Sequence, residues 1–467
     1  MKILVAHPAQ QHSYRLAAAL KKKRMLWRYV TTVYYKKKSF TAFVSLFLND
    51  HFRSKALSRR CNDLSDQDVI QYCEAEGLLK LLALNTSFFN RYYREIKYNT
   101  ADRFARKTAR YAVRSGVNAV ITYDDTSPVL FEILEKKSPD TIRIMDMSAA
   151  NVLYMRHIYD EDIKKAPAFE SRLRNERKIC WDPKTIERTK RELRAAQYYI
   201  VPSEFVGRSL QFSGIRSDQI YYCPYGVDIS EFPQKNYQKN IAEKRPLEFI
   251  YVGGVKELKG IYYLLEAFAR VPKEKAFLTV VGKYDPSDAD IAPYAEFVKF
   301  TGTVLHSEIP ALLGKADVFV LPSLGDSFAL AAMEAASCGL PLIISENTGI
   351  SDLITDGVEG FTVPVQSADA LVEKILFFVD HPEQICLMGT NARKMAEQHT
   401  WGRYNTAVTE AIEKIIAADS EKRGECNEHE NPCYRFSRIH WQKSGRKSEK
   451  HTGRQGPDAS GSDWKNR

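Results

Sequence analysis

Residues 321–335 read LPSLGDSFALAAMEA, and this stretch decides the fold class. The β-branched run VFVL ends at Leu321, a Pro-Ser turn follows, and the small-residue pattern after it predicts a helix beginning near Ser327. The same order of short strand, turn and helix recurs through the second half of the chain, which favours a parallel sheet covered by helices. The predicted strands of this half are residues 247–252, 277–281, 298–301, 318–321 and 341–345.

The first half shows the same alternation less regularly. Its predicted strands are residues 2–6, 28–35, 119–123, 142–147 and 198–201, and its predicted helices include 14–23 and 102–115. Residues 39–99 have a helical pattern and are expected to form an insertion over the sheet. The sequence therefore predicts an α/β protein with two domains, each built on a parallel sheet. Such sheets bind ligands at the carboxyl ends of their strands.

Composition supports a globular protein and argues against two other classes. The chain has 467 residues, of which 44% are hydrophobic and 27% charged. We find no apolar run near the roughly 20 residues that a membrane span requires. Eight cysteines over this length are too sparse for a disulfide framework, so reduced thiols are expected. Secretion and membrane spanning are therefore not expected, and a cytoplasmic location is predicted.

The positive charge of the chain is unevenly distributed. The net charge is +10, and the first acidic residue is Asp50, after ten Lys or Arg residues interleaved with aromatic side chains. No zinc finger or RNA-binding aromatic strand accompanies this charge, so nucleic acid is not predicted as a partner. Two interpretations remain open. The basic rim rests on anionic lipid at the inner face of the membrane, or it attracts an anionic substrate.

The loop after the strand at 247–252 carries the first candidate binding residues. It reads YVGGVKELKG, and Gly253 and Gly254 let the backbone approach a ligand closely. Lys259 stands at the predicted helix entry, where it can place a positive charge beside a phosphate. Glycines at such turns are also common structural devices, so this loop alone is a weak signal.

The loop after Leu321 carries the second set. Asp326 stands at the mouth of the predicted helix, and Glu334 follows eight residues later, about 80° around the helix axis. The first-turn amides are suited to binding a diphosphate. They belong to Ser327, Phe328, Ala329 and Leu330. The alternative is that Asp326 is a helix cap and Glu334 is incidental.

Together these pieces resemble a known family. The ordered set comprises Gly253 with Lys259-Gly260, Pro322-Ser323, Asp326-x7-Glu334 and Cys338-Gly339-Leu340-Pro341, supported by VPSEF at 201–205, YGVD at 225–228 and NTG at 347–349. It resembles the retaining GT-B glycosyltransferases of family 4, the glycosyl transferases group 1. The resemblance runs from about residue 195 to 405 and is fainter before it.

The resemblance implies two facing Rossmann-like domains and a division of labour between them. Residues 1–225 would bind the acceptor, 226–246 would be the linker, 247–399 would bind the nucleotide sugar, and 400–417 would form a closing helix. Residues 418–467 are expected to be a disordered basic tail. The implied activity is transfer of a sugar from a nucleotide-diphosphate donor to a hydroxyl of a glycan or lipid-linked acceptor, with retention of configuration.

The resemblance also implies roles for individual residues. Lys259 would contact the donor diphosphate, and Asp326, where the family usually has Glu, would hold hydroxyls of the donor sugar. Ser327, Phe328, Ala329 and Leu330 would supply backbone contacts, and Glu334 would bind the ribose. Neither a metal nor another cofactor is expected, because the lysine and the helix dipoles would neutralise the departing charge.

The chain departs from the family pattern at two positions. Gly254 stands where an Arg is common, and Lys256 is two residues away. Asp146 stands near the place of a frequent His, where it could orient a hydroxyl or cap the following turn. His12 is an acceptor-side candidate that could equally be structural, and a surface role is as plausible for His157.

Two other functions stay open at this level. A non-catalytic GT-B scaffold would bind nucleotide or a protein partner without transferring sugar, and an epimerase would isomerise the donor without releasing nucleotide. Cys426, His429, Cys433 and His440 have an unusual spacing for zinc, and a site there is not expected.

Overall fold

The computed structural model describes residues 1–9, 12–47, 50–85, 91–124, 126–237 and 246–428. Contacts divide the chain into two compact units, residues 1–415 and 416–467, which are described separately. The first unit contains two sheets in which every paired strand is parallel. This is the predicted α/β arrangement.

The first sheet has seven strands in the order β3-β2-β1-β4-β5-β6-β7. Their bounds are β1 Ile3–Ala6, β2 Leu26–Thr31, β3 Val69–Gln71, β4 Ala119–Tyr123, β5 Ile142–Asp146, β6 Tyr198–Val201 and β7 Ile220–Tyr222. The side chains of β1, β4 and β5 are buried along their whole length. The helices in this part are α1 Ser13–Lys22, α2 Phe40–Ser45, α3 Asp50–Leu57, α4 Glu74–Asn85, α6 Tyr93–Ser115, α7 Pro128–Lys137, α8 Val152–Lys165, α9 Glu170–Glu176, α10 Pro183–Ala195 and α11 Glu204–Phe212.

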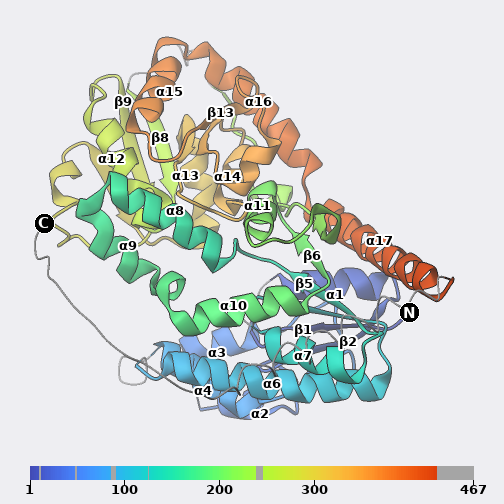
Figure 1. The fold of residues 1–467 in the computed structure, drawn as a ribbon. Helices are drawn as coiled ribbons and strands as arrows, with labels where there is room; N and C mark the ends of the chain where they lie inside the picture. Colours follow the sequence, from blue (N-terminus) through green and yellow to red (C-terminus); the bar gives the residue numbers. More distant parts are fainter. Residues whose placement is uncertain (10–11, 48–49, 86–90, 125, 238–245, 429–467) are drawn as a thin grey trace, which may run out of the picture. The chain divides into compact units, whose positions relative to one another are not determined.

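The second sheet has six strands in the order β10-β9-β8-β11-β12-β13. They are β8 Leu247–Val252, β9 Ala276–Val281, β10 Val298–Gly302, β11 Val318–Leu321, β12 Leu342–Ser345 and β13 Gly360–Val363. The helices are α12 Ile261–Ala269, α13 Ile309–Lys315, α14 Leu330–Ser337, α15 Ala368–Asp380, α16 Glu383–Gln398 and α17 Trp401–Glu428 (Figure 1). Strands β11 and β12 are fully buried, as their apolar composition requires.

Three strands were absent from the sequence-based prediction, namely β3, β7 and β13. Each has only three or four residues, which is too short for an alternating pattern to stand out. The strand β3 pairs with β2 at the edge of the first sheet, so residues 39–99 are not purely a helical insertion. The strand β2 also begins and ends earlier than the predicted residues 28–35.

Helix α17 starts where a closing helix was expected and extends further. In the first unit, the guanidinium of Arg15 on α1 lies 4.0 Å from the ring centroid of Trp401. In the second unit, the helix continues to Glu428, where residues beyond 417 were expected to be disordered. An ion pair one turn apart, Arg423 Nε to Asp419 Oδ2 at 2.7 Å, supports this extension.

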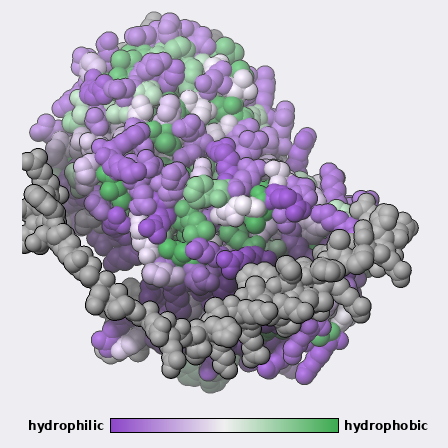
Figure 2. Space-filling view, in the orientation of Figure 1, coloured by the Kyte–Doolittle hydropathy of each residue, from purple (hydrophilic) through white to green (hydrophobic). Residues whose placement is uncertain are grey.

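Surface and thiol chemistry agree with the composition. Hydrophilic side chains dominate the face shown in Figure 2, with smaller apolar patches between them. Six of the cysteines in the described part of the chain are unpaired, namely Cys61, Cys73, Cys180, Cys223, Cys338 and Cys386. Within the same part of the chain, no helix is long and apolar enough to cross a bilayer.

Candidate functional site

Two loops at one edge of the second sheet bring predicted donor-site residues together. Strands β8 and β11 are hydrogen-bonded neighbours, so the loops after their carboxyl ends lie side by side. Lys259 ends a short 3-10 helix after β8, and Asp326 follows β11. The ammonium of Lys259 donates a hydrogen bond to Asp326 Oδ2. Residues 67 positions apart in the sequence therefore form one ion pair.

The glycine loop after β8 is held by its neighbours. The buried Tyr251 hydroxyl donates to the carbonyl of Gly254 at 2.9 Å, and a Cβ on Gly253 would lie 2.9 Å from that hydroxyl. Gly282 has φ +154°, and a Cβ there would lie 1.9 Å from the carbonyl oxygen of Gly253. At Gly254 a Cβ would approach nothing closer than 3.6 Å. The loop thus requires glycine at 282 but has room for a side chain at 254.

The structure corrects the predicted start of the helix after β11. Helix α14 begins at Leu330 instead of near Ser327, and Ala329 before it is left-handed at φ 60°. Asp326 Oδ1 accepts from the amides of Phe328 at 3.3 Å and Ala329 at 2.9 Å. A short polar side chain that bonds to the backbone two and three residues on favours a turn over a helix. Asp326 therefore caps this turn and binds Lys259 at the same time.

Glu334 lies within α14, whereas Asp326 lies before it, so the predicted 80° relation on one helix does not hold. His306 Nε2 lies 3.2 Å from Glu334 Oε1. Desolvation raises the pKa of Glu334, and the hydrogen bond and charge of His306 oppose that shift. Glu334 is thus a partly buried hydrogen-bond acceptor that already contacts His306.

The two acceptor-side candidates, His12 and Asp146, are in direct contact. His12 precedes α1 at the carboxyl end of β1, and Asp146 ends β5. His12 Nε2 lies 2.9 Å from Asp146 Oδ2, and the side chains are 10% and 2% exposed. A pair this close and this buried couples the orientation of the imidazole to the carboxylate.

Three buried tyrosines surround this pair. The rings of Tyr123, Tyr225 and Tyr404 lie 5.2, 4.8 and 6.4 Å from the His12 ring. Burial raises the pKa of each phenol well above its usual value, and the Asp146 charge adds to this. The three phenols therefore remain protonated. The hydroxyls of Tyr123 and Tyr404 find no hydrogen-bond partner among the described residues.

Contacts connect this cluster to the loop after β11. The ring of Tyr225 lies 5.5 Å from that of Phe328, and Ser203 Oγ donates to the carbonyl of Ser327 at 2.7 Å. Sequence reasoning noted the YGVD and VPSEF segments that contain Tyr225 and Ser203 without assigning them a role. Tyr404 carried no signal, because it lies far along the chain in a helix of ordinary pattern.

The remaining candidates fall outside the site. His157 is exposed and stacks on Phe212 at 5.4 Å, which fits the surface alternative. Among the described residues, no group of three or more His, Cys, Asp or Glu is arranged to hold a metal ion. Of the unusual zinc spacing in the tail, His429, Cys433 and His440 lie outside the described residues.

Comparison with a protein-family model matches part of the chain. Residues 246–381 match the family described as Glycosyl transferases group 1. This segment contains the second sheet and both candidate donor loops, and it supports the resemblance on which the site was predicted.

Curated proteins match part of the chain in sequence. The chain is 27% identical over 226 residues to the sulfoquinovosyl transferase SQD2 of Arabidopsis thaliana, covering 46% of this chain and 44% of that protein. It spans about half the length of the curated relatives it matches.

Solved structures cover more of the chain. A sucrose-phosphate synthase from Thermosynechococcus elongatus superposes with a TM-score of 0.59 at 18% identity, over 90% of this chain and all of that one. Anabaena HepE in complex with UDP and glucose gives 0.54 at 16% identity, over 89% and 100%. The chain therefore has the two-sheet α/β fold of GT-B glycosyltransferases.

Proposed function

We propose that this protein transfers a sugar from a nucleotide-diphosphate donor to an acceptor hydroxyl with retention of configuration, in the synthesis of a glycan or glycolipid. The observation that carries the proposal is the Lys259–Asp326 pair at the carboxyl edge of the second sheet, inside the segment that matches the family model. Because the HepE structure is a complex with UDP and glucose, a UDP-sugar is the first donor to test.

The donor side would act through charge. Lys259 would exchange part of its contact with Asp326 for the diphosphate and stabilise the leaving nucleotide. Asp326 would hold hydroxyls of the donor sugar, while Gly253, Gly254 and the 327–330 backbone line the same edge. Glu334 would accept hydrogen bonds from the ribose. Because this arrangement supplies its own cation, we propose that the reaction needs no metal.

The acceptor side would act through the first sheet, within residues 1–225. The imidazole of His12, fixed by Asp146 and enclosed by tyrosines, is suited to orienting a hydroxyl at the carboxyl edge of β1 and β5. His12 would thus act by orienting the acceptor hydroxyl. The phenols around it keep their protons and so add no charge beside it.

A donor screen tests the proposal. The purified chain is incubated with UDP-, GDP- and ADP-sugars, mixed glycan and lipid acceptors, and EDTA, and released nucleoside diphosphate is measured. We expect release with one donor class, and NMR of the product should show the donor's anomeric configuration. Binding without release with every donor would favour the scaffold. A new donor isomer without release would favour the epimerase.

We also propose that the enzyme works at an anionic membrane surface from the cytoplasmic side. Four apolar side chains in and after α2 are exposed by 47–76%, and we call them the α2 patch: Phe40, Phe43, Leu46 and Phe47. Lys37 and Lys38 beside it are exposed too. Exposed aromatics next to cations favour the lipid interface, and each nearby cation adds about 1 kcal/mol.

Vesicle co-sedimentation tests this placement. We expect binding to phosphatidylglycerol-containing vesicles at low salt, weaker binding at high salt, and a loss with Phe47→Ser. The matched variant Leu387→Ser removes an exposed leucine from α16 and should bind like the unmodified chain. Equal partitioning to neutral vesicles, or none at low salt, would leave the soluble alternative, in which the basic face attracts an anionic substrate.

A further inference from the structure

A cavity separate from the donor loops opens at the carboxyl edge of the first sheet. Its volume is about 160 Å³, and it is lined by the segments that directly follow β1 and β4, together with α4 and α6. Strands β1 and β4 are hydrogen-bonded neighbours, so this is the ligand-binding edge of that sheet. Whole-ligand pockets have about 300–1,000 Å³, so this cavity is sized for one group of a larger molecule.

Lys80 gives the cavity its chemical character. It projects from α4, and its ammonium donates to the carbonyl of Pro8 at 3.3 Å. Desolvation, and then the charges of Lys97 and Arg59, lower the pKa of Lys80 to about 8. The groups that act on this ammonium are therefore cationic, and a carbonyl oxygen alone leaves its charge uncompensated. A half-buried cation in this position gains from an anion.

Helix α6 supplies the facing wall. Tyr93, Lys97, Thr100 and Ala101 line the cavity at a spacing of three to four residues, which puts them on one face of α6. Hydroxyl and ammonium groups on this wall can donate hydrogen bonds to an oxyanion that also contacts Lys80. Asp124 is the one carboxylate among the described lining residues, and it accepts from Ser148 Oγ at 3.0 Å.

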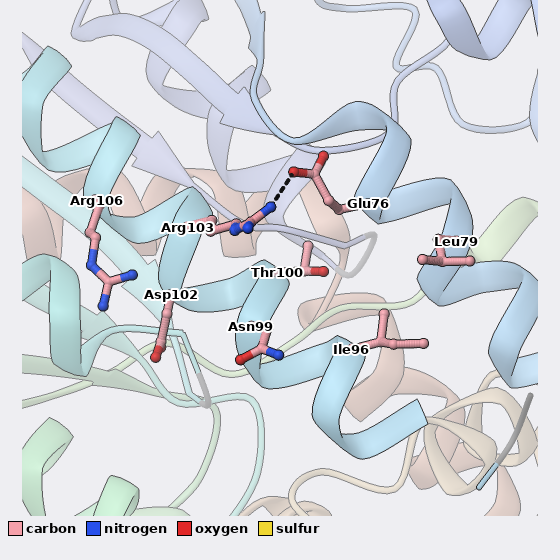
Figure 3. Close-up of a pocket in the computed structure, with 8 residues that line it drawn as sticks. All are labelled: Glu76, Leu79, Ile96, Asn99, Thr100, Asp102, Arg103 and Arg106. Atoms are coloured by element: carbon pink, nitrogen blue, oxygen red, sulfur yellow. Dashed lines mark hydrogen bonds and ion pairs between the residues drawn. The ribbon is translucent and has the colours of Figure 1, made fainter. Parts of the chain in front are cut away.

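Another face of the same helix borders a separate outer groove. Figure 3 shows Ile96, Asn99 and Arg103 of α6 opposite Glu76 and Leu79 of α4. There Arg103 Nη1 pairs with Glu76 Oε1 at 3.4 Å. Thr100 lines both hollows, so they adjoin each other at α6. In the outer groove Arg103 is paired with an acid, whereas the hydrogen bond and the charge interactions of Lys80 among the described residues include no carboxylate.

We propose that the cavity at Lys80 binds an anionic group, a phosphate or a carboxylate, carried by the acceptor. Only the identification of the ligand as the acceptor rests on the proposed transferase function. The anion site itself is inferred from the cavity and its cations. It would anchor a charged acceptor at the edge of the sheet that also holds His12, and it would select against neutral acceptors.

Calorimetric titration at constant ionic strength tests the site with inorganic phosphate and, separately, glucuronate. We expect at least one of them to bind the unmodified chain and Lys80→Gln to weaken that binding about tenfold, the loss of one charge-assisted contact. Lys80→Arg, which restores the cation, should bind within about threefold of the unmodified chain. The control is Lys107→Gln, which removes an exposed lysine from α6, the helix of the facing wall. It should bind the anion as the unmodified chain does.

The outcomes separate this inference from the proposed function. No sugar nucleotide is present, so Lys80-dependent binding in a chain that transfers no sugar would support the site and contradict only the transferase. Equal anion binding by Lys80→Gln and the unmodified chain overturns the inference, and so does an equal loss in Lys107→Gln. Circular dichroism of Lys80→Gln and retention in Lys80→Arg guard against a folding defect. The stronger of the two anions identifies the group as phosphate or carboxylate.

Discussion

Replacing Lys259 with alanine separates the chemical contribution of its charge from its structural one. The ammonium is bonded to Asp326, and the two side chains are 26% and 18% exposed. Ion pairs with this access to water contribute about 0.2–1 kcal/mol to stability. Asp326 keeps both of its backbone hydrogen bonds when the lysine is gone. We therefore expect the free energy of unfolding to fall by about 1 kcal/mol or less.

Turnover should fall much further, because the charge acts on the leaving diphosphate as negative charge develops. Removing one such group costs about 10²-fold to 10³-fold in kcat. A hundredfold loss corresponds to about 2.7 kcal/mol of transition-state stabilisation. The effect on the reaction would thus exceed the effect on folding by more than twofold in free energy.

Two measurements on the same preparation check this. Urea unfolding gives the stability, and nucleoside diphosphate release with the donor found in the screen gives kcat. The control is Lys275→Ala, an exposed lysine before β9 at the opposite edge of the sheet. If Lys259→Ala keeps kcat within about threefold of the control, its assigned role is refuted, whatever its stability.

Three other perturbations follow from the site. Gly254→Arg should change the free energy of unfolding by no more than about 0.5 kcal/mol, because its Cβ meets only ordinary contacts. It should also tighten UDP binding in calorimetry, and weaker binding would contradict the role assigned to the loop. Asp146→Asn should lower kcat about tenfold or more by releasing His12, whereas Tyr404→Phe, which removes an unpartnered hydroxyl, should change it little; equal effects would remove Asp146 from the site. Burial raises the pKa of Glu257 from 4.5 to about 8, so the folded chain holds a proton that the unfolded chain releases, and stability should fall as pH rises through this window. Glu257→Gln should flatten that slope in unfolding titrations at several pH values, and an unchanged slope would assign it to other groups.

Sequence reasoning reached the donor loops because their order along the chain implies their position in space. Loops after parallel strands of one sheet lie at the same edge, so both donor loops were predicted to face one ligand site, whereas the pairing of β8 with β11 that joins Lys259 to Asp326 is seen only in the structure. The same reasoning offered Asp326 as a cap but missed the turn before α14, because the pattern does not show that Ala329 is left-handed and delays the helix to Leu330. Local hydrogen bonds such as those of the Asp326 carboxylate compete with helix formation without changing hydrophobic periodicity.

The acceptor side was harder to predict for a different reason. Asp146 and His12 were each proposed with a structural alternative, and their contact across 134 residues depends on the order of the strands β1, β4 and β5. Lys80 was not singled out at all. A lysine on an amphipathic helix normally faces water, and only the packing of α4 beside the β1 loop reveals that this one does not.

The enclosure of His12 has a consequence for building hybrid enzymes. Its imidazole belongs to the first sheet, yet Tyr404 beside it comes from the start of α17, after the whole second sheet. Exchanging residues 247–399 for those of another donor domain would keep all three tyrosines around His12, provided that the graft keeps Phe328 against Tyr225, whereas a graft running to the end of the chain would import a foreign neighbour for His12. The unit of exchange is therefore an insert with two junctions, and donor specificity can be transplanted without disturbing the acceptor machinery only by cutting on both sides.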